Sequence, residues 1–159
     1  MPDIALYQPD IPQNTGTILR MAACMGVTVR VIEPAGFPLS DHALKRAGMD
    51  YLERAAMIRH VSYDNFQDWC RESGRRLVLM TTKGSVSYNG FQFEADDILL
   101  FGRESVGVPD TVQEDADKRV KIPMTPGMRS LNVAVSAAMI LGEALRQTNL
   151  FPPMAGEAC

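Results

Sequence analysis

The sequence is poor in the residues that build metal, disulfide and redox sites. Its 159 residues include three cysteines and two histidines, with no CxxC pair and no cysteine close to a histidine. An odd number of widely spaced cysteines (Cys24, Cys70 and Cys159) is typical of reduced thiols rather than of a disulfide framework or a zinc site. The isolated His42 and His60 are each expected to be solvated or hydrogen-bonded. We therefore expect a protein that needs no metal ion.

Long hydrophobic runs and an excess of basic residues are also missing. No apolar run approaches the length of a membrane-spanning helix, and the first ten residues, MPDIALYQPD, lack the basic and apolar parts of a secretion signal. These absences favour a cytoplasmic protein with no membrane partner. The formal net charge of −3 provides no global attraction for a nucleic acid, so a polyanion would have to meet a local basic surface.

The common nucleotide-binding fingerprints are absent as well. The first predicted strand continues into QPDIPQNTG, which lacks the spaced glycines of the GxGxxG dinucleotide motif, and no GxxxxGK[ST] loop occurs in the chain. ATP binding of the usual P-loop kind loses most of its support. A Rossmann-type oxidoreductase is kept as an alternative, and it alone predicts that a dinucleotide binds.

Apolar runs alternate with amphipathic segments along the whole chain. The predicted strands are residues 4–7, 27–32, 56–58, 77–81, 98–101 and 119–122, and the predicted helices are residues 14–25, 40–48, 62–73, 109–116 and 130–147. Continuous apolar strands between helices indicate an α/β fold, a parallel sheet with helices on both faces. We expect a single domain over residues 1–159 with a frayed tail at 151–159. Residues 83–93 are predicted to be a loop with a hairpin-like turn at Asn89 and Gly90.

The last predicted helix has an unusual composition. Ser130 is the expected N-cap, and a stripe at three-and-four spacing is expected to be buried: Val133, Ala137, Ile140, Leu141, Ala144 and Leu145. Other positions of this helix are small, among them Ala134 and Gly142. Because Gly142 costs a helix interior about 1 kcal/mol relative to alanine, we expect a close backbone contact there to compensate.

Three predicted strands are followed by loops rich in glycine, proline and small polar residues. These loops read TTKG at residues 81–84, GRESVGVP at 102–109 and PMTPGMRSLN at 123–132. In an open parallel sheet, ligands bind beyond the carboxyl ends of the strands. The three loops therefore predict a backbone-lined pocket for an adenosine-like ligand, in which Gly102 lets the backbone approach the ligand.

These loops also carry a family resemblance. NTGTILR at residues 14–20, LLFGRESVGVP at 99–109 and IPMTPGMRSLNVAVSAA at 122–138 resemble, in order, the three motifs of the SpoU branch of the SPOUT RNA 2′-O-methyltransferases. YQPDIPQNTGTILR at 7–20, RAGMDY at 46–51 and TTKG are similar to the small members of that branch that methylate the wobble ribose of tRNA. The resemblance spans nearly the whole chain.

The resemblance implies a fold, a cofactor and partners. The implied fold is the SPOUT fold, in which the C-terminal helix passes through a preceding loop to make a trefoil knot. The implied cofactor is S-adenosyl-L-methionine, and the implied assembly is a homodimer. The implied substrate is the anticodon stem-loop of tRNA, with cytidine or a modified uridine at the wobble position and leucine tRNAs as the expected acceptors.

The resemblance also implies site residues. The cofactor-binding set is Met80, Thr81, Gly102, Glu104, Ile122, Met124, Ser130 and Leu131. The catalytic set is Asn14, Arg20, Glu104, Ser130 and Asn132. Each has a simpler interpretation: Asn14, Ser130 and Asn132 as helix caps, Glu104 as an ion-pair partner and Arg20 as a surface arginine. Because a guanidinium does not release its proton near neutral pH, we expect Arg20 to hold a substrate phosphate and stabilise the developing 2′-alkoxide rather than act as the base.

Two further functions are kept as alternatives. Within the same chemistry, the chain could methylate a different tRNA or rRNA ribose. It could also be a non-catalytic RNA- or nucleotide-binding module, for which a degenerate site would be expected. The presence of all five catalytic motif residues argues against the second alternative.

Overall fold

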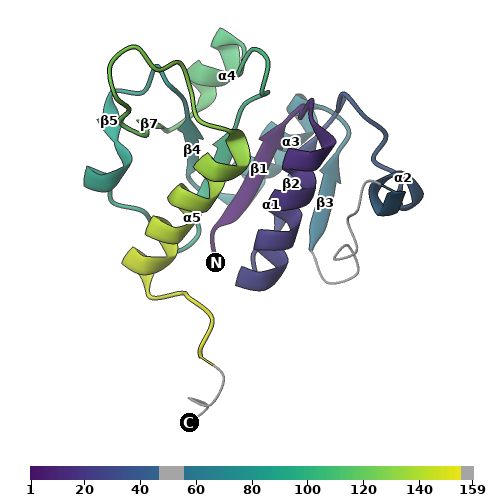
Figure 1. The fold of residues 1–159 in the computed structure, drawn as a ribbon, viewed down its shortest axis with the longest axis horizontal. Helices are drawn as coiled ribbons and strands as arrows, with labels where there is room; N and C mark the ends of the chain where they lie inside the picture. The colour runs from purple at the N-terminus through teal and green to yellow at the C-terminus, as the bar shows by residue number, and fades with distance from the viewer. Residues whose placement is uncertain (47–55, 155–159) are drawn as a thin grey trace.

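Parallel strands form one sheet in the computed structural model, which describes residues 1–46 and 56–154 (Figure 1). Seven strands are present in these residues: β1 (Asp3–Tyr7), β2 (Val29–Ile32), β3 (Met57–His60), β4 (Leu77–Met80), β5 (Val86–Ser87), β6 (Ile98–Phe101) and β7 (Lys118–Lys121). They lie in the order β3-β2-β1-β6-β4-β7-β5, and every pairing is parallel. The predicted α/β class and parallel sheet are confirmed.

Helices cover both faces of the sheet, as predicted. The described residues contain α1 (Pro12–Met25), α2 (Asp41–Arg46), α3 (Tyr63–Ser73), the 3₁₀ helix η1 (Tyr88–Gly90), α4 (Asp110–Asp115) and α5 (Val133–Thr148). α1 and α5 pack side by side on one face (Figure 1), where Ile18 and Ile140 join the same buried core. Phe66 of α3 and Val112 of α4 belong to a second core on the other face.

The carboxyl ends of the central strands meet at one edge of the sheet. Leu6 of β1 pairs with Phe101 of β6, Phe101 pairs with Met80 of β4, and Met80 pairs with Val120 of β7. The loops that follow these four strands therefore leave the sheet at the same level. This edge is where an open parallel sheet binds its ligand.

The predicted start of α1 is wrong by two residues. The helix begins at Pro12, after an extended Ile11, and Asn14 lies in its first turn instead of capping it. Proline suits the first helical position because it has a fixed φ and its missing N–H would have no helical partner there. The predicted end is confirmed, since Gly26 closes the helix in the left-handed region with φ 67°.

The predicted cap of α5 is also wrong. The N-cap is Asn132, whose side-chain oxygen accepts hydrogen bonds from the backbone N–H groups of Ala134 (2.8 Å) and Val135 (3.3 Å). Ser130 lies two residues before this cap, in the preceding loop. Five of the six predicted stripe residues are buried, and the first, Val133, is half-buried because the helix begins there.

Two further local predictions fail. Residues 83–93 contain no hairpin-like turn at Asn89 and Gly90: Val86 pairs in parallel with Val120 at the edge of β7, and the next three residues form η1. The close contact expected at Gly142 is not found, because an added Cβ there would meet no atom within 4 Å outside its own turn of helix. Nothing in the described residues offsets the cost of this glycine.

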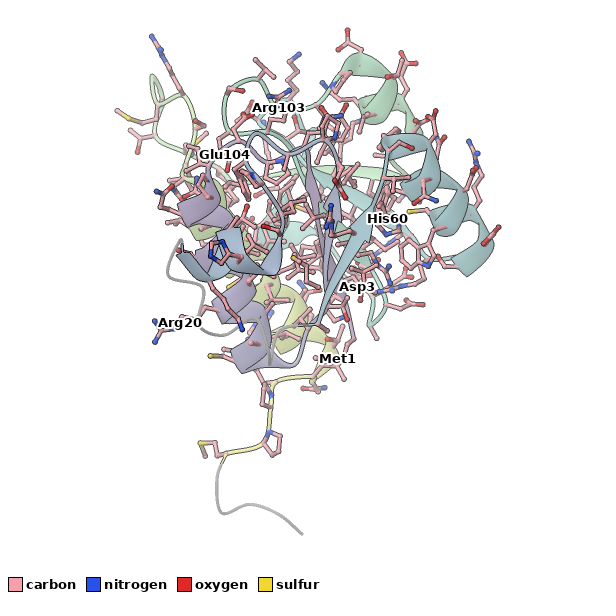
Figure 2. The ribbon with its side chains drawn as sticks, turned by 90° about the vertical axis from the view of Figure 1, so that its right-hand side faces the viewer. Met1, Asp3, Arg20, His60, Arg103 and Glu104 are labelled. Atoms are coloured by element: carbon pink, nitrogen blue, oxygen red, sulfur yellow. The ribbon has the colours of Figure 1, made fainter. Side chains whose placement is uncertain are left out.

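A buried ionic cluster packs against Trp69 of α3. Arg30 donates from Nε to Asp3 Oδ2 at 2.7 Å, and its guanidinium carbon lies 3.4 Å from the centroid of the Trp69 ring. Arg75 donates to the same carboxylate oxygen at 2.9 Å. His60 Nε2 lies 3.3 Å from Arg30 Nη1, and burial, followed by the Arg30 charge, lowers the pKa of His60. Figure 2 shows Asp3 and His60 in this part of the molecule.

Some predictions fall outside the described residues. Most of the RAGMDY stretch at 46–51 lies there, as does the end of the predicted tail, residues 155–159. The described part of that tail, 151–154, is exposed and follows Asn149, which ends α5 in the left-handed region with φ 56°.

Candidate active site

A pocket of about 650 Å³ opens at the carboxyl edge of the sheet. Its size lies in the range of pockets that hold cofactors. Its wall comes from the start of α1, from the loops after β4, β6 and β7, and from the first turn of α5. The lining includes every predicted site residue except Arg20: Asn14, Met80, Thr81, Gly102, Glu104, Ile122, Met124, Ser130, Leu131 and Asn132.

The loop after β6 is closed on itself by backbone hydrogen bonds. Arg103 N donates to Gly107 O at 3.0 Å, and Gly107 N donates to Arg103 O at 2.9 Å. Gly102 packs directly against this closure, because an added Cβ would lie 2.8 Å from the Gly107 Cα atom. Gly107 itself has φ 71°, which favours glycine. Gly102 therefore keeps the loop closed, a role in addition to the ligand contact that the sequence predicted.

Asp10 fixes this loop to the segment that leads into α1. Its Oδ1 accepts a hydrogen bond from Arg103 Nε at 3.1 Å and a second from Nη2. Its Oδ2 accepts from the hydroxyl and the backbone N–H of Ser105. The hydrogen bonds from Arg103, and then those from Ser105, lower the pKa of Asp10 to about 2. The hydrogen bond with Asp10 in turn raises the pKa of Arg103. Sequence reasoning missed Asp10, because its partners lie more than 90 residues away in the chain.

Glu104 holds the start of α1. Its carboxylate accepts hydrogen bonds from Asp10 N at 2.8 Å, from Ile11 N at 3.4 Å and from Asn14 Nδ2 at 3.3 Å. α1 has no cap from its own N-cap side chain, so this carboxylate supplies the acceptor and the negative charge that a helix N-terminus favours. Glu104 is therefore an orienting group for the wall of the pocket.

An amide pair links α1 to α5 beside the pocket. Asn132 Nδ2 donates to Asn14 Oδ1 at 2.9 Å, while Asn132 Oδ1 caps α5. Together with Glu104 this makes one continuous chain of hydrogen bonds from the loop after β6, through Asn14, to the N-terminus of α5. The structure thus brings together three residues that the sequence placed in one site from three distant motifs.

The TTKG loop lies tightly on β7. Thr81 N donates to Val120 O at 2.9 Å, and Gly84 N donates to Thr81 O at 3.1 Å. A Cβ on Gly84 would lie 2.7 Å from the Val120 carbonyl carbon, so no side chain fits at this position. These contacts hold Thr81 at the pocket wall and place Lys83 beside it in the lining.

Apolar side chains line the β4 and β7 side of the pocket. Met80, Ile122 and Met124 are half-buried, and Leu131 is 40% exposed. Two thioethers and two aliphatic chains around an open space can contact the faces of a planar ring, and methionine adapts readily to such shapes. This surface is suited to a planar ring such as adenine.

Arg20 is the one predicted site residue that the pocket does not include. It is exposed on α1, six residues after Asn14, which places it about 9 Å further along the helix axis. Figure 2 shows Arg20 pointing outward, far from Arg103 and Glu104. Within one chain, Arg20 therefore does not face the pocket.

The part of the chain that the structure describes lacks two kinds of feature. No helix there combines the length and apolar character that crossing a bilayer requires. No group of three histidine, cysteine, aspartate or glutamate side chains in residues 1–46 and 56–154 is arranged as metal ligands.

Comparison with known proteins identifies the family. Residues 2–142 match the SpoU rRNA Methylase family. The chain is 64% identical over 144 residues to a tRNA (cytidine(34)-2′-O)-methyltransferase from Beijerinckia indica subsp. indica, covering 91% of this chain and 90% of the relative.

Two solved structures are similar in fold. One, described as giving structural insights into the 2-OH methylation of C/U34 on tRNA, has a TM-score of 0.86 and 40% identity, and the match covers 92% of this chain and 95% of the other. The SpoU methyltransferase AviRb from Streptomyces viridochromogenes, solved in complex with AdoMet, has a TM-score of 0.81 and 29% identity and covers 92% of this chain and 57% of its own. The family model covers most of the chain, and with these relatives it shows that the protein belongs to the SpoU methylase family.

Proposed function

We propose that this protein is a tRNA (cytidine(34)-2′-O)-methyltransferase that transfers a methyl group from S-adenosyl-L-methionine to the ribose of the wobble nucleotide. The observation that carries the proposal is the pocket at the carboxyl edge, built from three motif loops, in a chain 64% identical to an enzyme of that name. The relatives of this chain are named as enzymes of the predicted class.

The residues of the pocket fit the proposed cofactor. An apolar surface for the adenine is offered by Met80, Ile122, Met124 and Leu131. The closed loop after Gly102 brings backbone atoms close to the interior of the pocket. The cofactor would supply a methyl group that is already activated by its bond to a positively charged sulfur. The protein then has to orient the ribose 2′-oxygen, exclude water and help remove one proton.

The chain of hydrogen bonds through Asn14 does the orienting. Glu104 and Asn132 fix Asn14 from both sides, so the wall beside the reacting atoms is held before substrate arrives. Ser130 is exposed on the loop before α5 and lines the pocket, where its hydroxyl is available to the substrate. Positioning of this kind raises the rate because less entropy is lost when the bound substrate reaches the transition state.

Arg20 acts at the pocket of a second copy in a homodimer. Arg20 lies outside the pocket of its own chain. Two apolar residues that line this pocket, Ile11 and Leu131, are 41% and 40% exposed and offer surface that a partner could bury. In a two-fold dimer, α1 of one copy can place Arg20 over the other copy's pocket, where it would hold a substrate phosphate and stabilise the developing alkoxide.

The remaining family features are part of the same proposal. The loop of residues 122–132 and α5 would form the trefoil knot of the SPOUT fold, and the small, buried Ala134 and Ala137 of α5 suit a narrow passage. The enzyme would act in the cytoplasm on the anticodon stem-loop, with cytidine or a modified uridine at the wobble position. Leucine tRNAs are the first substrates to test.

One assay tests the function directly. Purified protein is incubated with total tRNA and methyl-labelled cofactor, and the labelled position is mapped by nuclease digestion and nucleoside analysis. A 2′-O-methyl group at the wobble nucleotide supports the proposal. Label at another tRNA ribose, or label in rRNA when rRNA is supplied, would establish the alternative substrate instead.

A further inference from the structure

Two basic side chains line the pocket outside the predicted site. Lys83 and Arg129 are both exposed, and neither forms an ion pair with any residue in the described parts of the chain. The third cation of the wall, Arg103, is paired with Asp10. The carboxylate of Glu104 is held by amide groups. The pocket lining therefore carries two positive charges that have no ion-pair partner among the described residues, although the chain has a net charge of −3.

Each of these cations extends from a fixed turn. Lys83 N donates to Thr81 Oγ1 at 3.2 Å, and the next residue, Gly84, is buried against the backbone of β7. Arg129 follows a turn in which Met128 N donates to Thr125 O at 3.2 Å. Pro126 and Gly127, the latter with φ 89°, occupy the central positions that a type II turn favours. Both backbones are thus held in place while the charged ends stay in solvent.

The two turns belong to loops that leave neighbouring strands. β4 and β7 are neighbours in the sheet, and Thr81 N donates to Val120 O where the two loops begin. Asn14 and Glu104 come from α1 and from the loop after β6, toward the other side of the strand order. The same pocket is therefore lined by the amides of Asn14 and Asn132, by the carboxylate of Glu104 and by the two cations.

We propose that Lys83 and Arg129 form a phosphate-binding rim that holds the RNA backbone next to the target nucleotide. The inference rests on the proposed function and adds residues that position its substrate. Arg and Lys bind phosphate oxygens without reading sequence, so such contacts fix the register of the RNA on the protein. Because both side chains are exposed, they are placed to meet a polymer that arrives from solvent.

The amino acid carboxylate of the cofactor offers the same anionic chemistry, and the test separates the two sources. Affinity for tRNA is measured at several salt concentrations for the wild type, Lys83→Ala, Arg129→Ala and the double variant, and affinity for S-adenosylhomocysteine is measured by calorimetry. Each single substitution should weaken tRNA binding by about threefold or more and reduce the slope of log K against log salt by about 0.7, the value for one single-strand phosphate contact. Affinity for S-adenosylhomocysteine should stay within twofold, which is about 0.4 kcal/mol.

Lys118→Ala is the matched control. Lys118 is exposed, carries no ion pair with a described residue and begins β7, at the opposite end of that strand from the pocket. It should leave both the tRNA affinity and the salt slope close to the wild-type values. If Lys118→Ala reduced the salt slope equally, the effect on tRNA binding would depend on overall charge and not on these two residues, and the proposal would be overturned.

Other outcomes are equally decisive. Unchanged tRNA affinity with weakened S-adenosylhomocysteine binding would assign the two cations to the cofactor and end the proposal, as would no change in either. A wild-type protein that methylates no tRNA would refute the proposed function itself, and the methylation assay reports that result before any variant is made.

Discussion

The side-chain amide of Asn132 donates a hydrogen bond of 2.9 Å to Asn14, which lies 118 residues earlier in the chain. The same Asn132 caps α5 through its oxygen, so one side chain both starts the last helix and holds the first helix against it. Two functions in one residue can be separated by choosing substitutions that keep one of them.

Asn132→Ala should lower the free energy of unfolding by about 1 kcal/mol, because it removes a helix cap, and should also weaken S-adenosylhomocysteine binding. Asn132→Ser keeps a capping oxygen but loses the amide that reaches Asn14. It should therefore recover most of the stability without recovering affinity. Denaturant unfolding and calorimetry measure the two effects. Ser62→Ala, which removes the cap of α3 on the other side of the molecule, serves as the control and should cost stability alone.

Gly102→Ala should reduce affinity for S-adenosylhomocysteine by about tenfold or more, since the added Cβ would lie 2.8 Å from Gly107 and would force the loop open. Gly90→Ala is a matched substitution outside the pocket, where a Cβ meets no atom within 4 Å and φ is not positive. It should bind the ligand like the wild type. Equal affinities for the wild type and Gly102→Ala would show that the closure of this loop does not shape the cofactor site.

Arg20→Ala should reduce turnover by about a hundredfold while leaving affinity for S-adenosylhomocysteine near the wild-type value, because the arginine lies outside its own chain's pocket. Arg20→Lys should restore little, since lysine lacks the planar fork that binds phosphate with two hydrogen bonds. Single-turnover methylation at saturating tRNA is the measurement. A full rate for Arg20→Ala would remove this residue from the catalytic set.

Mixing two inactive variants tests whether the site is shared. When Arg20→Ala and Gly102→Val proteins exchange subunits in equal amounts, half of the dimers should be mixed, and each should contain one pocket with an intact Gly102 and an Arg20 from the partner. Activity should then return to about a quarter of the wild-type value. If the mixture stays inactive although the subunits have exchanged, Arg20 acts only within its own chain or not at all.

The free energy of unfolding should fall as the pH decreases from 7 to 5. The pKa of His60 is lowered in the folded protein, so the unfolded chain binds a proton first, and stability is lost as the pH falls below the ordinary histidine value. The groups that face His60 are Arg30, Trp69, Phe66 and Asn65, with Asp3 beyond Arg30. The hydrogen bond with Asn65 opposes the lowering of the His60 pKa, and burial and the Arg30 charge outweigh it. His60→Gln should flatten this part of the stability profile, whereas His42→Gln, at an exposed position, should not.

Sequence reasoning predicted the sheet and the location of the pocket because both depend on local patterns. The run ILLF is buried on both faces as β6, and the Gly-rich loop that follows it lines the pocket. The register of parallel strands then brings the loops together at one edge without further information.

The contacts that complete the site could not be predicted in the same way. In the sequence, Asp10 cannot be told from an ordinary loop carboxylate. Only the fold places it against Arg103 and Ser105. Likewise, the sequence suggested a cap for both Ser130 and Asn132, and the choice between them depends on where the loop before α5 turns. The role of Arg20 rests on the family resemblance alone. Because Arg20 points outward from α1, that role requires a second copy of the chain whose pocket it can reach.

The hydrogen bonds from Asp10 N to the Glu104 carboxylate and from Asn132 Nδ2 to Asn14 join residues separated by 94 and 118 positions. Contacts this distant in the chain form late in folding, because closing long loops costs entropy before any contact is gained. A nascent chain that has not yet emerged as far as α5 can form its early strands but has no complete pocket. Ligand binding would therefore occur only to chains whose synthesis and folding are finished, and it would stabilise them selectively.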